Sequence, residues 1–326
     1  MSNERAPVAR VAVVGGFNMD LVFRAPRRPL AGETLVGTAF AMFMGGKGSN
    51  QAIAAARAGG RVEMIGRLGA DSFGQDIAAA LDLEGIGLRY AVRDEQEGTG
   101  VAGIVVEPDG TNSIVVVPRA NMRLSAEDIR QARDAIAGAA VLLLQLETPV
   151  EASEAAARIA RASGATVILN PAPARELPVS LWALVDVLVP NEREAEQLTG
   201  LPVATEQEAA RAAAALLGRG VGSVVITLGA RGALVLDGQG PALIPSYPLQ
   251  AVDTTAAGDA FCGALAVALA EGRSLRDAVR FACAAGALSV TVMGAAPSLP
   301  RREAIEWLLA GATGVPPATA GNAKRG

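Results

Sequence analysis

Histidine is absent from all 326 residues of the sequence. Its ordinary pKa makes it the side chain best suited to proton transfer near neutral pH, so a general base here must be Asp, Glu, Lys, Tyr or a thiol. Without imidazole nitrogens, metal sites must depend on oxygen ligands. The missing histidine therefore limits the chemistry of this chain to these groups.

Cysteine is also scarce, and an excess of positive charge is absent. The two cysteines, Cys262 and Cys283, lie in apolar helical patterns, as buried free thiols do in a reducing cytoplasm, so we expect no disulfide and no metal role. The formal net charge of −4 provides no basic field that would attract nucleic acid or an anionic membrane. Both features favour a cytoplasmic protein that acts on small ligands.

Long apolar runs and aromatic residues are few. The longest apolar run, near residues 260–270, is too short to cross a bilayer, and the polar start Met1–Arg5 predicts no signal peptide. Aromatic residues make up 3% of the chain although apolar residues make up 51%. The core must therefore be filled mainly by Ala, Val and Leu, which suits closely packed layers of helices on a sheet.

A repeated strand and helix pattern fills the middle of the chain. Apolar runs that end in polar or small residues alternate with helical stretches, which predicts an α/β fold: a doubly wound, mainly parallel sheet flanked by helices. The runs are residues 141–147, 166–170, 186–191 and 223–228. Ligands of such sheets lie beyond the carboxyl ends of the strands. The residues that this rule brings to one edge are Asn18, Asp20, Glu147, Asn170, Asn191, Glu194 and Gly229.

Two pairs of strands interrupt this pattern. The first pair is predicted at residues 21–28 and 33–43, and the second is a predicted hairpin of residues 100–107 and 111–118. We expect these four strands to form a small separate sheet, within about residues 18–44 and 98–120, that covers the site as a lid. Such a lid excludes water, which would otherwise compete as an acceptor.

Polar residues at the predicted strand ends are candidates for contacts with a polyhydroxy ligand. Asn18 and Asp20 follow the first strand, and an amide with a carboxylate offers both donors and acceptors to hydroxyl groups. An ordinary turn is the competing interpretation of this pair. Glu147 should face the same edge, although a role in capping the next helix remains open.

Two further segments are compatible with a nucleotide. Asn191 and Glu194 follow a strand and place an amide near a carboxylate, where Mg²⁺ could be held directly or through water. An acidic helix start would look the same. The loop Thr227–Gly232 fits either a nucleotide or a plain turn.

Residues 45–50, Gly-Gly-Lys-Gly-Ser-Asn, precede an alanine-rich helix. The glycines allow close approach of the backbone to a ligand, and Lys47 could reach a phosphate or a sugar oxygen. The spacing is not that of a P-loop, and a flexible turn with a surface lysine is the alternative. Residues Gly98–Gly103 have the glycine spacing of a dinucleotide-binding motif. That motif must lead into a helix, whereas these residues lead into a predicted strand, so we reject it.

The segment Asp253–Phe261 opens a helix that has Asp259 in its first turn. A helix N-terminus has unpaired N–H groups and a partial positive charge, so it suits an anion such as phosphate. Small side chains at 256–258 leave those groups uncovered. An aspartate is also favoured there as a plain cap, so this position alone does not establish a catalytic base.

Taken together, these motifs resemble those of the ribokinase group within the PfkB family of carbohydrate and nucleoside kinases. The similarity extends from about Val11 to Leu309, nearly the whole chain. Residues 45–50 with the following helix, and residues 253–263, carry it most specifically. Residues 170–178 and Asn191-x-x-Glu194 also match in order and spacing.

The resemblance implies a role for each matching residue. It implies Asp259 as the catalytic base, with an anion hole formed by the N–H groups of Ala256, Ala257 and Gly258. Sugar contacts are implied for Asn18, Asp20, Gly46, Lys47, Asn50, Glu147 and Asp259. Nucleotide contacts are implied for Asn191, Thr227, Gly229, Gly232, Gly258 and Cys283, with Glu194 in the motif linked to Mg²⁺. An activating monovalent cation is implied at Asp253, Thr255, Ser289, Val292, Gly294 and Ser298.

The activity that the resemblance implies is ATP-dependent phosphorylation of D-ribose at O5, giving D-ribose 5-phosphate and ADP, with Mg²⁺ and K⁺. It also implies a homodimer through the lid sheets. One alternative is a kinase for 2-deoxyribose, another pentose or a nucleoside. Another is a non-catalytic sugar-binding regulator, although such a protein would not need a base. A dehydrogenase is disfavoured because the first strand–helix turn lacks the dinucleotide fingerprint.

Three residues depart from the ribokinase pattern. Cys283 stands near the expected adenine pocket, where His or Asn is common, and Met44 and Arg119 are bulkier than expected beside the sugar site. They leave nucleotide affinity and the choice of sugar open. We expect one kinase domain over residues 1–312 and a disordered tail, rich in Ala, Gly, Pro and Thr, over 313–326.

Overall fold

The computed structural model describes residues 9–311, so the predicted tail at residues 313–326 lies outside the described range. Within residues 9–311 a nine-stranded sheet has the order β13-β12-β11-β10-β9-β8-β1-β4-β5. Its strands are β1 (Arg10–Val14), β4 (Arg61–Gly69), β5 (Gly87–Asp94), β8 (Val141–Leu144), β9 (Thr166–Leu169), β10 (Val187–Leu188), β11 (Ser223–Thr227), β12 (Ala233–Asp237) and β13 (Gly240–Ile244). Neighbouring strands from β11 to β5 are parallel, and the antiparallel pairs of this sheet are β11 with β12 and β12 with β13. The predicted mainly parallel sheet is confirmed.

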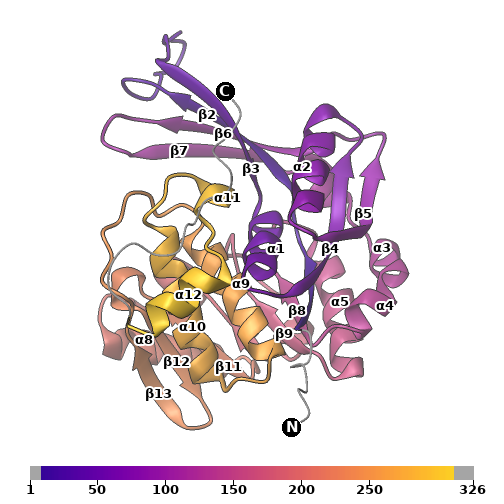
Figure 1. Ribbon diagram of the computed structural model, residues 1–326, viewed down its shortest axis with the longest axis vertical. Coiled ribbons are helices and arrows are strands. Elements are labelled where there is room, and N and C mark those ends of the chain that lie inside the picture. The colour runs from indigo at the N-terminus through magenta and orange to yellow at the C-terminus, as the bar shows by residue number, and fades with distance from the viewer. Residues whose placement is uncertain (1–8, 312–326) are drawn as a thin grey trace.

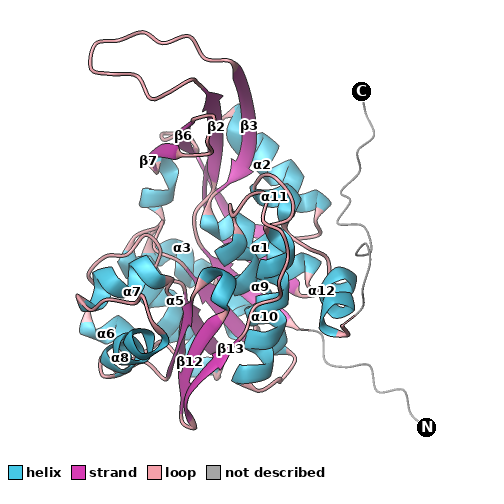
Figure 2. Ribbon diagram, turned by 90° about the vertical axis from the view of Figure 1, so that its left-hand side faces the viewer, coloured by secondary structure: helices cyan, strands magenta, loops and turns pink. Residues whose placement is uncertain are grey.

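Helices cover both faces of this sheet (Figures 1 and 2). In β1, Val11 and Val13 pack into one core cluster and Ala12 and Val14 into the other, because successive side chains of a strand point to opposite faces. The first cluster includes α1 (Lys47–Arg57), α2 (Ser72–Leu83), α9 (Ala257–Ala270), α10 (Leu275–Ser289) and α12 (Arg302–Leu309). The second includes α3 (Ala126–Gln131), α4 (Arg133–Ala137), α5 (Val150–Ser163), α6 (Val179–Trp182), α7 (Glu192–Thr199) and α8 (Glu206–Leu217).

The close contact between α1 and α9 positions the site. Gly263 lies one turn after Asp259, and a Cβ atom there would be 2.5 Å from the Ala54 Cβ and 2.7 Å from the Gln51 backbone oxygen. Because glycine has no Cβ, the two helices approach until the start of α9 faces the start of α1. Both helix starts therefore lie at the same edge of the sheet.

The lid is a separate sheet, four-stranded in the described part of the chain, with the order β3-β2-β6-β7. Its strands are β2 (Asn18–Arg24), β3 (Ala39–Gly45), β6 (Gly100–Val106) and β7 (Asn112–Val117). Figures 1 and 2 show it projecting from one end of the molecule. The predicted hairpin is confirmed.

The predicted limits of the first strand pair, 21–28 and 33–43, are wrong. β2 begins at Asn18, which pairs with Gly45 and Gly100, and it ends at Arg24. The residues between β2 and β3 contain Pro26 and Pro29, which lack the N–H that a strand ladder needs. They form a loop instead of extending the strands.

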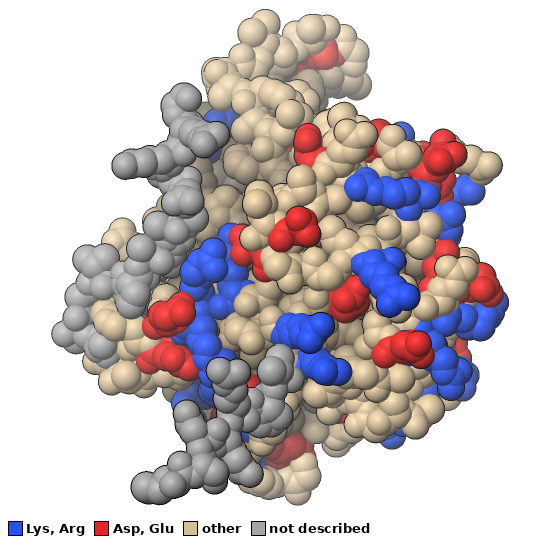
Figure 3. All heavy atoms as spheres, turned by 45° about the vertical axis from the view of Figure 1, so that its right-hand side comes forward, with Lys and Arg blue, Asp and Glu red and all other residues tan. Residues whose placement is uncertain are grey.

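The surface in Figure 3 carries acidic and basic side chains interspersed with one another. Ion pairs such as Arg57 with Glu84 and Arg302 with Glu306 link neighbouring side chains on the described surface. Among the described residues, no helix has both the length and the apolar character needed to cross a membrane.

Candidate active site

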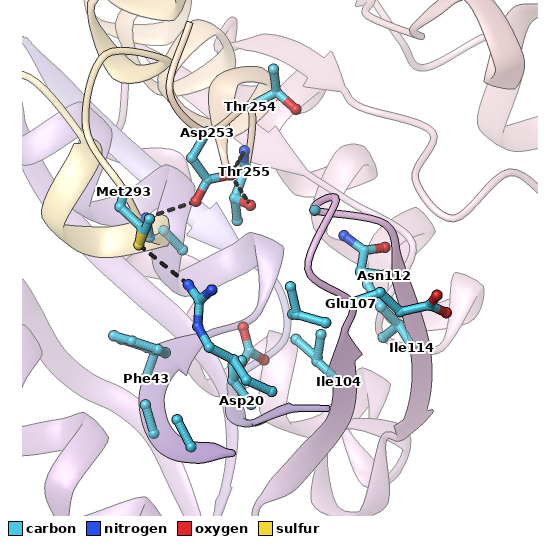
Figure 4. Close-up of a pocket in the computed structure, with 18 of the residues that line it drawn as sticks. Asp20, Phe43, Ile104, Glu107, Asn112, Ile114, Asp253, Thr254, Thr255 and Met293 are labelled. Atoms are coloured by element: carbon cyan, nitrogen blue, oxygen red, sulfur yellow. Dashed lines mark hydrogen bonds between the residues drawn. The ribbon is translucent and has the colours of Figure 1, made fainter. Parts of the chain in front are cut away.

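Three neighbouring cavities open at the carboxyl ends of the central strands. The first, of about 500 Å³, lies between the lid and residues 251–255 (Figure 4). The second cavity, of about 600 Å³, is lined by the residues that follow β10 and β11, by the start of α9 and by the segment 246–249. The third, of about 210 Å³, contains Lys47 and Asp259, and Thr254 lines all three. Ligands in the first two cavities would therefore meet near Asp259.

Glycines at the start of α1 build the floor of the site. Gly46 precedes α1 with φ 88°, a conformation that favours glycine. A Cβ atom on Gly48 would lie 2.7 Å from the Gly16 backbone, and one on Gly45 would collide with the Asp20 carboxylate. The segment is therefore part of β3 and α1 and not a flexible turn, and its glycines let α1 begin directly against the loop after β1.

The structure brings all seven predicted sugar-binding residues together. Asn18 pairs with Gly45 in the lid, and the Lys47 backbone N donates to Glu147 Oε2 at 2.8 Å. Asn50 Nδ2 donates to Asp259 Oδ2 at 3.0 Å. The Asn50 Oδ1 atom is buried without a partner among the described residues, which leaves it available to a ligand hydroxyl. The other two residues of the set are Asp20, which lies on β2, and Gly46, which directly precedes α1.

Asp20 points from β2 into the first cavity (Figure 4). Burial is the largest cause, and together with the nearby Glu147 and Asp259 carboxylates it raises the pKa of the Asp20 carboxyl to about 7. Burial likewise raises the pKa of Glu147 above its ordinary value. Such concentrated acidic groups stabilise a bound ligand that donates several hydrogen bonds, as a polyhydroxy compound does.

Asn121 is a buried site residue that the sequence did not single out. Its Nδ2 donates to Asn18 Oδ1 at 3.0 Å, and it also bonds both backbone groups of Phe17. Because the Asn18 oxygen is thereby occupied, the Asn18 amide nitrogen is left to face a ligand as a donor. Asn121 lies 103 residues away from Asn18 in the sequence, so only the fold reveals the contact.

Asp259 lies in the first turn of α9 and is 7% exposed. Both of its oxygens accept hydrogen bonds, Oδ2 from Asn50 and Oδ1 from Gln51 Nε2 at 2.9 Å. Burial raises its pKa, whereas Lys47 and the two amide donors act to lower it. The alternative of a plain cap does not apply, because Ala256 caps α9 without any side-chain bond.

The backbone before Asp259 forms an anion-binding turn. Ala256 has φ 61°, which is rare for a residue with a Cβ atom and often marks a functional site. Within the described residues, the N–H groups of Ala256 and Gly258 donate no hydrogen bond, and nothing lies within 4 Å of a Cβ placed on Gly258. These free donors at a helix N-terminus suit a phosphate oxygen.

Lys47 is the only lysine among residues 9–311, where arginine supplies the other cationic side chains. It lines the third cavity together with Asp259 and Glu194. Burial acts to lower its pKa, but the carboxylates of Asp259, Glu147 and Glu194 outweigh burial and raise it. The lysine is thus held fully charged where a ligand would bridge the cavities.

Six predicted nucleotide-binding residues line the second cavity: Asn191, Thr227, Gly229, Gly232, Gly258 and Cys283. Asn191 and Thr227 form a parallel bridge that continues the sheet beyond β10 and β11. At Gly232, φ is 103° and a Cβ atom would lie 2.6 Å from the Ser246 nitrogen. The segment 246–249 thereby closes over the cavity and contributes Tyr247, which the sequence did not single out.

Glu194 and Asn191 form the capping box of α7. Asn191 Oδ1 accepts from the Glu194 N–H, and Glu194 Oε2 accepts from the Asn191 N–H, both at 2.8 Å. The alternative of an acidic helix start is therefore correct. The two side chains can still contact a ligand as well. Glu194 lines the third cavity and its Oε1 accepts no hydrogen bond from a described residue, so the oxygen ligands fit Mg²⁺ held directly or through water.

The residues predicted to bind a monovalent cation surround one loop. Asp253 Oδ2 accepts from the Gly294 N–H at 2.8 Å, and Asp253 Oδ1 accepts from the Thr255 N–H at 2.9 Å (Figure 4). Described backbone groups donate no hydrogen bond to the backbone oxygens of Thr255 and Val292. These oxygens fit a cation that takes carbonyl ligands. Ser289 ends α10, and Ser298 ends α11 (Ala295–Ser298).

The residues that depart from the ribokinase pattern differ in their placement. Met44 pairs with Met19 and packs against the core, and Arg119 donates to Glu97 and to the Thr99 backbone oxygen. Neither lines any of the three cavities. Their bulk therefore does not narrow these three cavities. Cys283 does line the second cavity, and burial raises the pKa of its thiol to about 12.

A buried carboxylate beside a helix N-terminus, with one cavity beneath a lid and a second, larger cavity close by, is an arrangement that suits a small-molecule kinase. Residues 8–302 match the pfkB family carbohydrate kinase domain. The chain belongs to this family.

The similar proteins include kinases of two sugars. The ribokinase of Haemophilus influenzae is 45% identical over 299 residues, which cover 91% of this chain and 98% of that protein. The deoxyribokinase of Salmonella typhi is 37% identical over 294 residues, covering 90% and 96%. The solved structure of Arabidopsis thaliana ribokinase complexed with ribose and ATP has a TM-score of 0.86 and 36% identity, covering 93% of this chain and 99% of that one.

Proposed function

We propose that this protein catalyses the ATP-dependent phosphorylation of D-ribose at O5, which yields D-ribose 5-phosphate and ADP. The buried Asp259 carboxylate, held by Asn50 and Gln51 beside the free N–H groups of α9, carries this proposal. The similarity to ribokinases at 40–45% identity supports ribose as the sugar.

The proposed sugar site uses the polar residues beneath the lid. Asp20 and Glu147 would accept hydrogen bonds from ring hydroxyls, and the Asn18 amide would donate one. The Asn50 Oδ1 atom, which has no described partner, would accept another. These contacts fix the ring so that O5 lies next to Asp259, and the lid excludes competing water.

The transfer step needs one base and one anion site. Asp259 accepts the proton of the O5 hydroxyl while O5 attacks the γ-phosphorus. The bond from the γ-phosphorus to the bridging oxygen breaks, and ADP leaves with that electron pair. The free N–H groups of Ala256 and Gly258 stabilise the charge on the transferring oxygens, and the Ala257 N–H, which bonds the Thr254 oxygen at 3.3 Å, would join them by turning to the phosphate. Lys47 adds a positive charge at the same place.

The nucleotide would occupy the second cavity, with its phosphates directed toward Lys47 and the start of α9. Glu194, with Asn191, would hold Mg²⁺, which when bound supplies positive charge that neutralises phosphate oxygens. The loop of Asp253, Thr255 and Gly294 would hold K⁺ and thereby keep the anion-binding turn in shape. Ser289, Val292 and Ser298 complete this proposed cation site.

A kinase for 2-deoxyribose is the second candidate, because the Salmonella typhi deoxyribokinase is similar over 90% of this chain. The two sugars differ by one hydroxyl, and a site that hydrogen-bonds a hydroxyl rejects the analogue that lacks it. Another pentose or a nucleoside is less favoured. A regulator without catalysis would not need the Asp259 arrangement.

The test is ADP release over a panel of D-ribose, 2-deoxyribose, fructose and adenosine, each with MgATP in K⁺ or Na⁺. We expect D-ribose to give the highest kcat/KM and K⁺ to give the higher rate. If 2-deoxyribose leads, the second candidate is correct. Equal rates in the two salts would contradict the proposed cation site.

We further propose that the chain is one kinase domain that pairs through its lid and works in the cytoplasm. The lid face opposite the sugar cavity exposes large apolar side chains, which a second copy would cover. They are Phe23, Met42, Val115 and Val117. The two buried free cysteines suit a reducing compartment.

A further inference from the structure

We propose that Gln51 is a positioning residue that fixes the orientation of the Asp259 carboxylate and favours its ionised form, with Gln145 holding Gln51 in turn. The inference rests on the proposed role of Asp259 as the base of the kinase reaction. It gives a role to two buried side chains that are not among the proposed ligand contacts and line none of the three cavities.

A chain of side-chain amides leads to the carboxylate. Gln145 Nε2 donates to Gln51 Oε1 at 2.6 Å. Gln51 Nε2 then donates to Asp259 Oδ1 at 2.9 Å and to Asn170 Oδ1 at 3.1 Å. Gln51 and Gln145 are both 0% exposed, so water does not replace these bonds.

The direction of each hydrogen bond follows from its neighbour. Because Gln145 occupies the carbonyl oxygen of Gln51, only the Gln51 NH₂ group can face the carboxylate. Asn50 donates to the other carboxylate oxygen. Asp259 is therefore held at both oxygens by amide donors from adjacent residues of α1, and its remaining lone pairs are directed away from α1 to receive a proton.

Amide donors also act on the acidity of Asp259. A hydrogen bond to a carboxylate stabilises the ionised form, so loss of the Gln51 donor raises the pKa of Asp259. Since the base must be ionised to accept a proton, a higher pKa moves the acidic limb of the pH–rate profile to higher pH.

Other charges face Asp259 from each surrounding element. Lys47 lies on the same helix as Gln51, Asp20 on β2, Glu147 after β8 and Glu194 on α7. The Cys262 thiol lies on α9 itself. A substitution at Gln51 leaves all of these groups in place. A difference between the pH–rate profiles of the variant and the parent protein therefore reports the loss of the hydrogen bond from Gln51 to Asp259.

The experiment measures kcat against pH for the parent, Gln51→Met and Gln51→Glu, with saturating D-ribose and MgATP. Met keeps the length of the side chain but donates nothing, and we expect an upward shift of about one pH unit, or roughly tenfold in kcat on that limb. Glu retains an acceptor for Gln145 but turns a second acceptor toward Asp259, so its shift should be larger. The control is Gln75→Met at an exposed position of α2, which should leave the profile unchanged.

An unchanged acidic limb in Gln51→Met, with kcat lowered equally at every pH or not at all, would overturn the inference. If neither Gln51 variant folds, Gln145→Met provides the test, because it removes the support of Gln51 without touching Asp259. We expect it to shift the limb in the same direction, and an unshifted limb would again overturn the inference. Absence of ribose-dependent ADP release from the parent protein would instead mean that the proposed function is wrong.

Discussion

The pKa of Asp259 is set by electrostatic effects that act in opposite directions. Burial disfavours its ionised form, whereas Lys47 and the amides of Asn50 and Gln51 favour it. A carboxylate is a weak base in water, and burial increases its affinity for a proton. The donors oppose that increase. The balance suits a base in a protein that has no histidine.

Replacing Asp259 with Asn should lower kcat by about 10²–10⁴-fold and leave the KM for D-ribose largely unchanged. The amide keeps the shape of the side chain but cannot accept the O5 proton. Steady-state ADP release measures the effect, and Asp76→Asn at an exposed position of α2 is the matched control. Near-normal turnover in the Asp259 variant would contradict its role as the base.

Placing carboxylates close together for ligand binding lowers the stability of the fold, as Asp20 shows. Burial and two acidic neighbours raise its pKa from 3.8 in an unfolded chain to about 7. Between these two pH values the folded protein binds a proton that the unfolded chain has released. Stability therefore falls as pH rises from about 4 to 7, and the destabilisation is fully present above pH 7.

Asp20→Asn should accordingly stabilise the unliganded protein at pH 8, by on the order of 2–4 kcal/mol, while raising the KM for D-ribose. Denaturant unfolding of both proteins at pH 8 and pH 4.5 measures the difference. The gain should shrink toward pH 4.5, because the parent residue is then protonated in the folded state. A gain that is equal at both pH values would contradict the assigned pKa shift.

At the scale of elements, the approach of α9 to α1 sets the distance between the base and its donors. Gly263 permits this approach, since a Cβ atom there would meet the Ala54 side chain and the α1 backbone. A displacement of α9 moves Asp259 relative to Asn50 and Gln51. Small displacements matter because phosphoryl transfer depends on positioning.

Gly263→Ala should destabilise the fold by about 1–3 kcal/mol and lower kcat more than it raises the KM for D-ribose. Unfolding curves and kinetics measured on the same preparation test both effects. Gly286→Ala on α10 is the stability control, because its Cβ would have no neighbour closer than 3.5 Å. Unfolding curves of Gly263→Ala that coincide with those of the parent would contradict the close contact.

The sequence predicted the elements better than it predicted their contacts. Periodicity and turn residues located the parallel sheet and the β6–β7 hairpin, because these signals are local. The limits of β2 and β3 depend on pairing between distant strands, such as Asn18 with Gly100. Asn121, Gln51 and Gln145 escaped notice for the same reason, since buried amides have no sequence signature until their partners are known.

At the scale of the whole molecule, the lid presents different faces to the cavity and to solvent. Asp20 and Ile114 line the cavity, whereas Val115 on the opposite face is 69% exposed. Phe23 of that outer face contacts Phe40, its cross-strand partner in β3, with ring centroids 5.1 Å apart. An exposed apolar face of this kind favours association with a second copy.

Val115→Asp should convert a dimer into single chains of 33.0 kDa. The charge would be desolvated on pairing, which an apolar interface does not tolerate. Light scattering coupled to gel filtration gives the mass. Leu83→Asp at the end of α2, where the parent side chain is 89% exposed, is the control and should retain the dimer. A parent protein that elutes as a monomer at all concentrations would contradict lid pairing.

The most direct test of the central claim is the identity of the product. Purified protein is incubated with MgATP, K⁺ and D-ribose, and the product is analysed by ³¹P and ¹³C NMR. We expect one phosphomonoester, with the phosphate attached at C5, formed in equal amount with ADP. Failure to form a sugar phosphate, or attachment at another carbon, would contradict the proposed function.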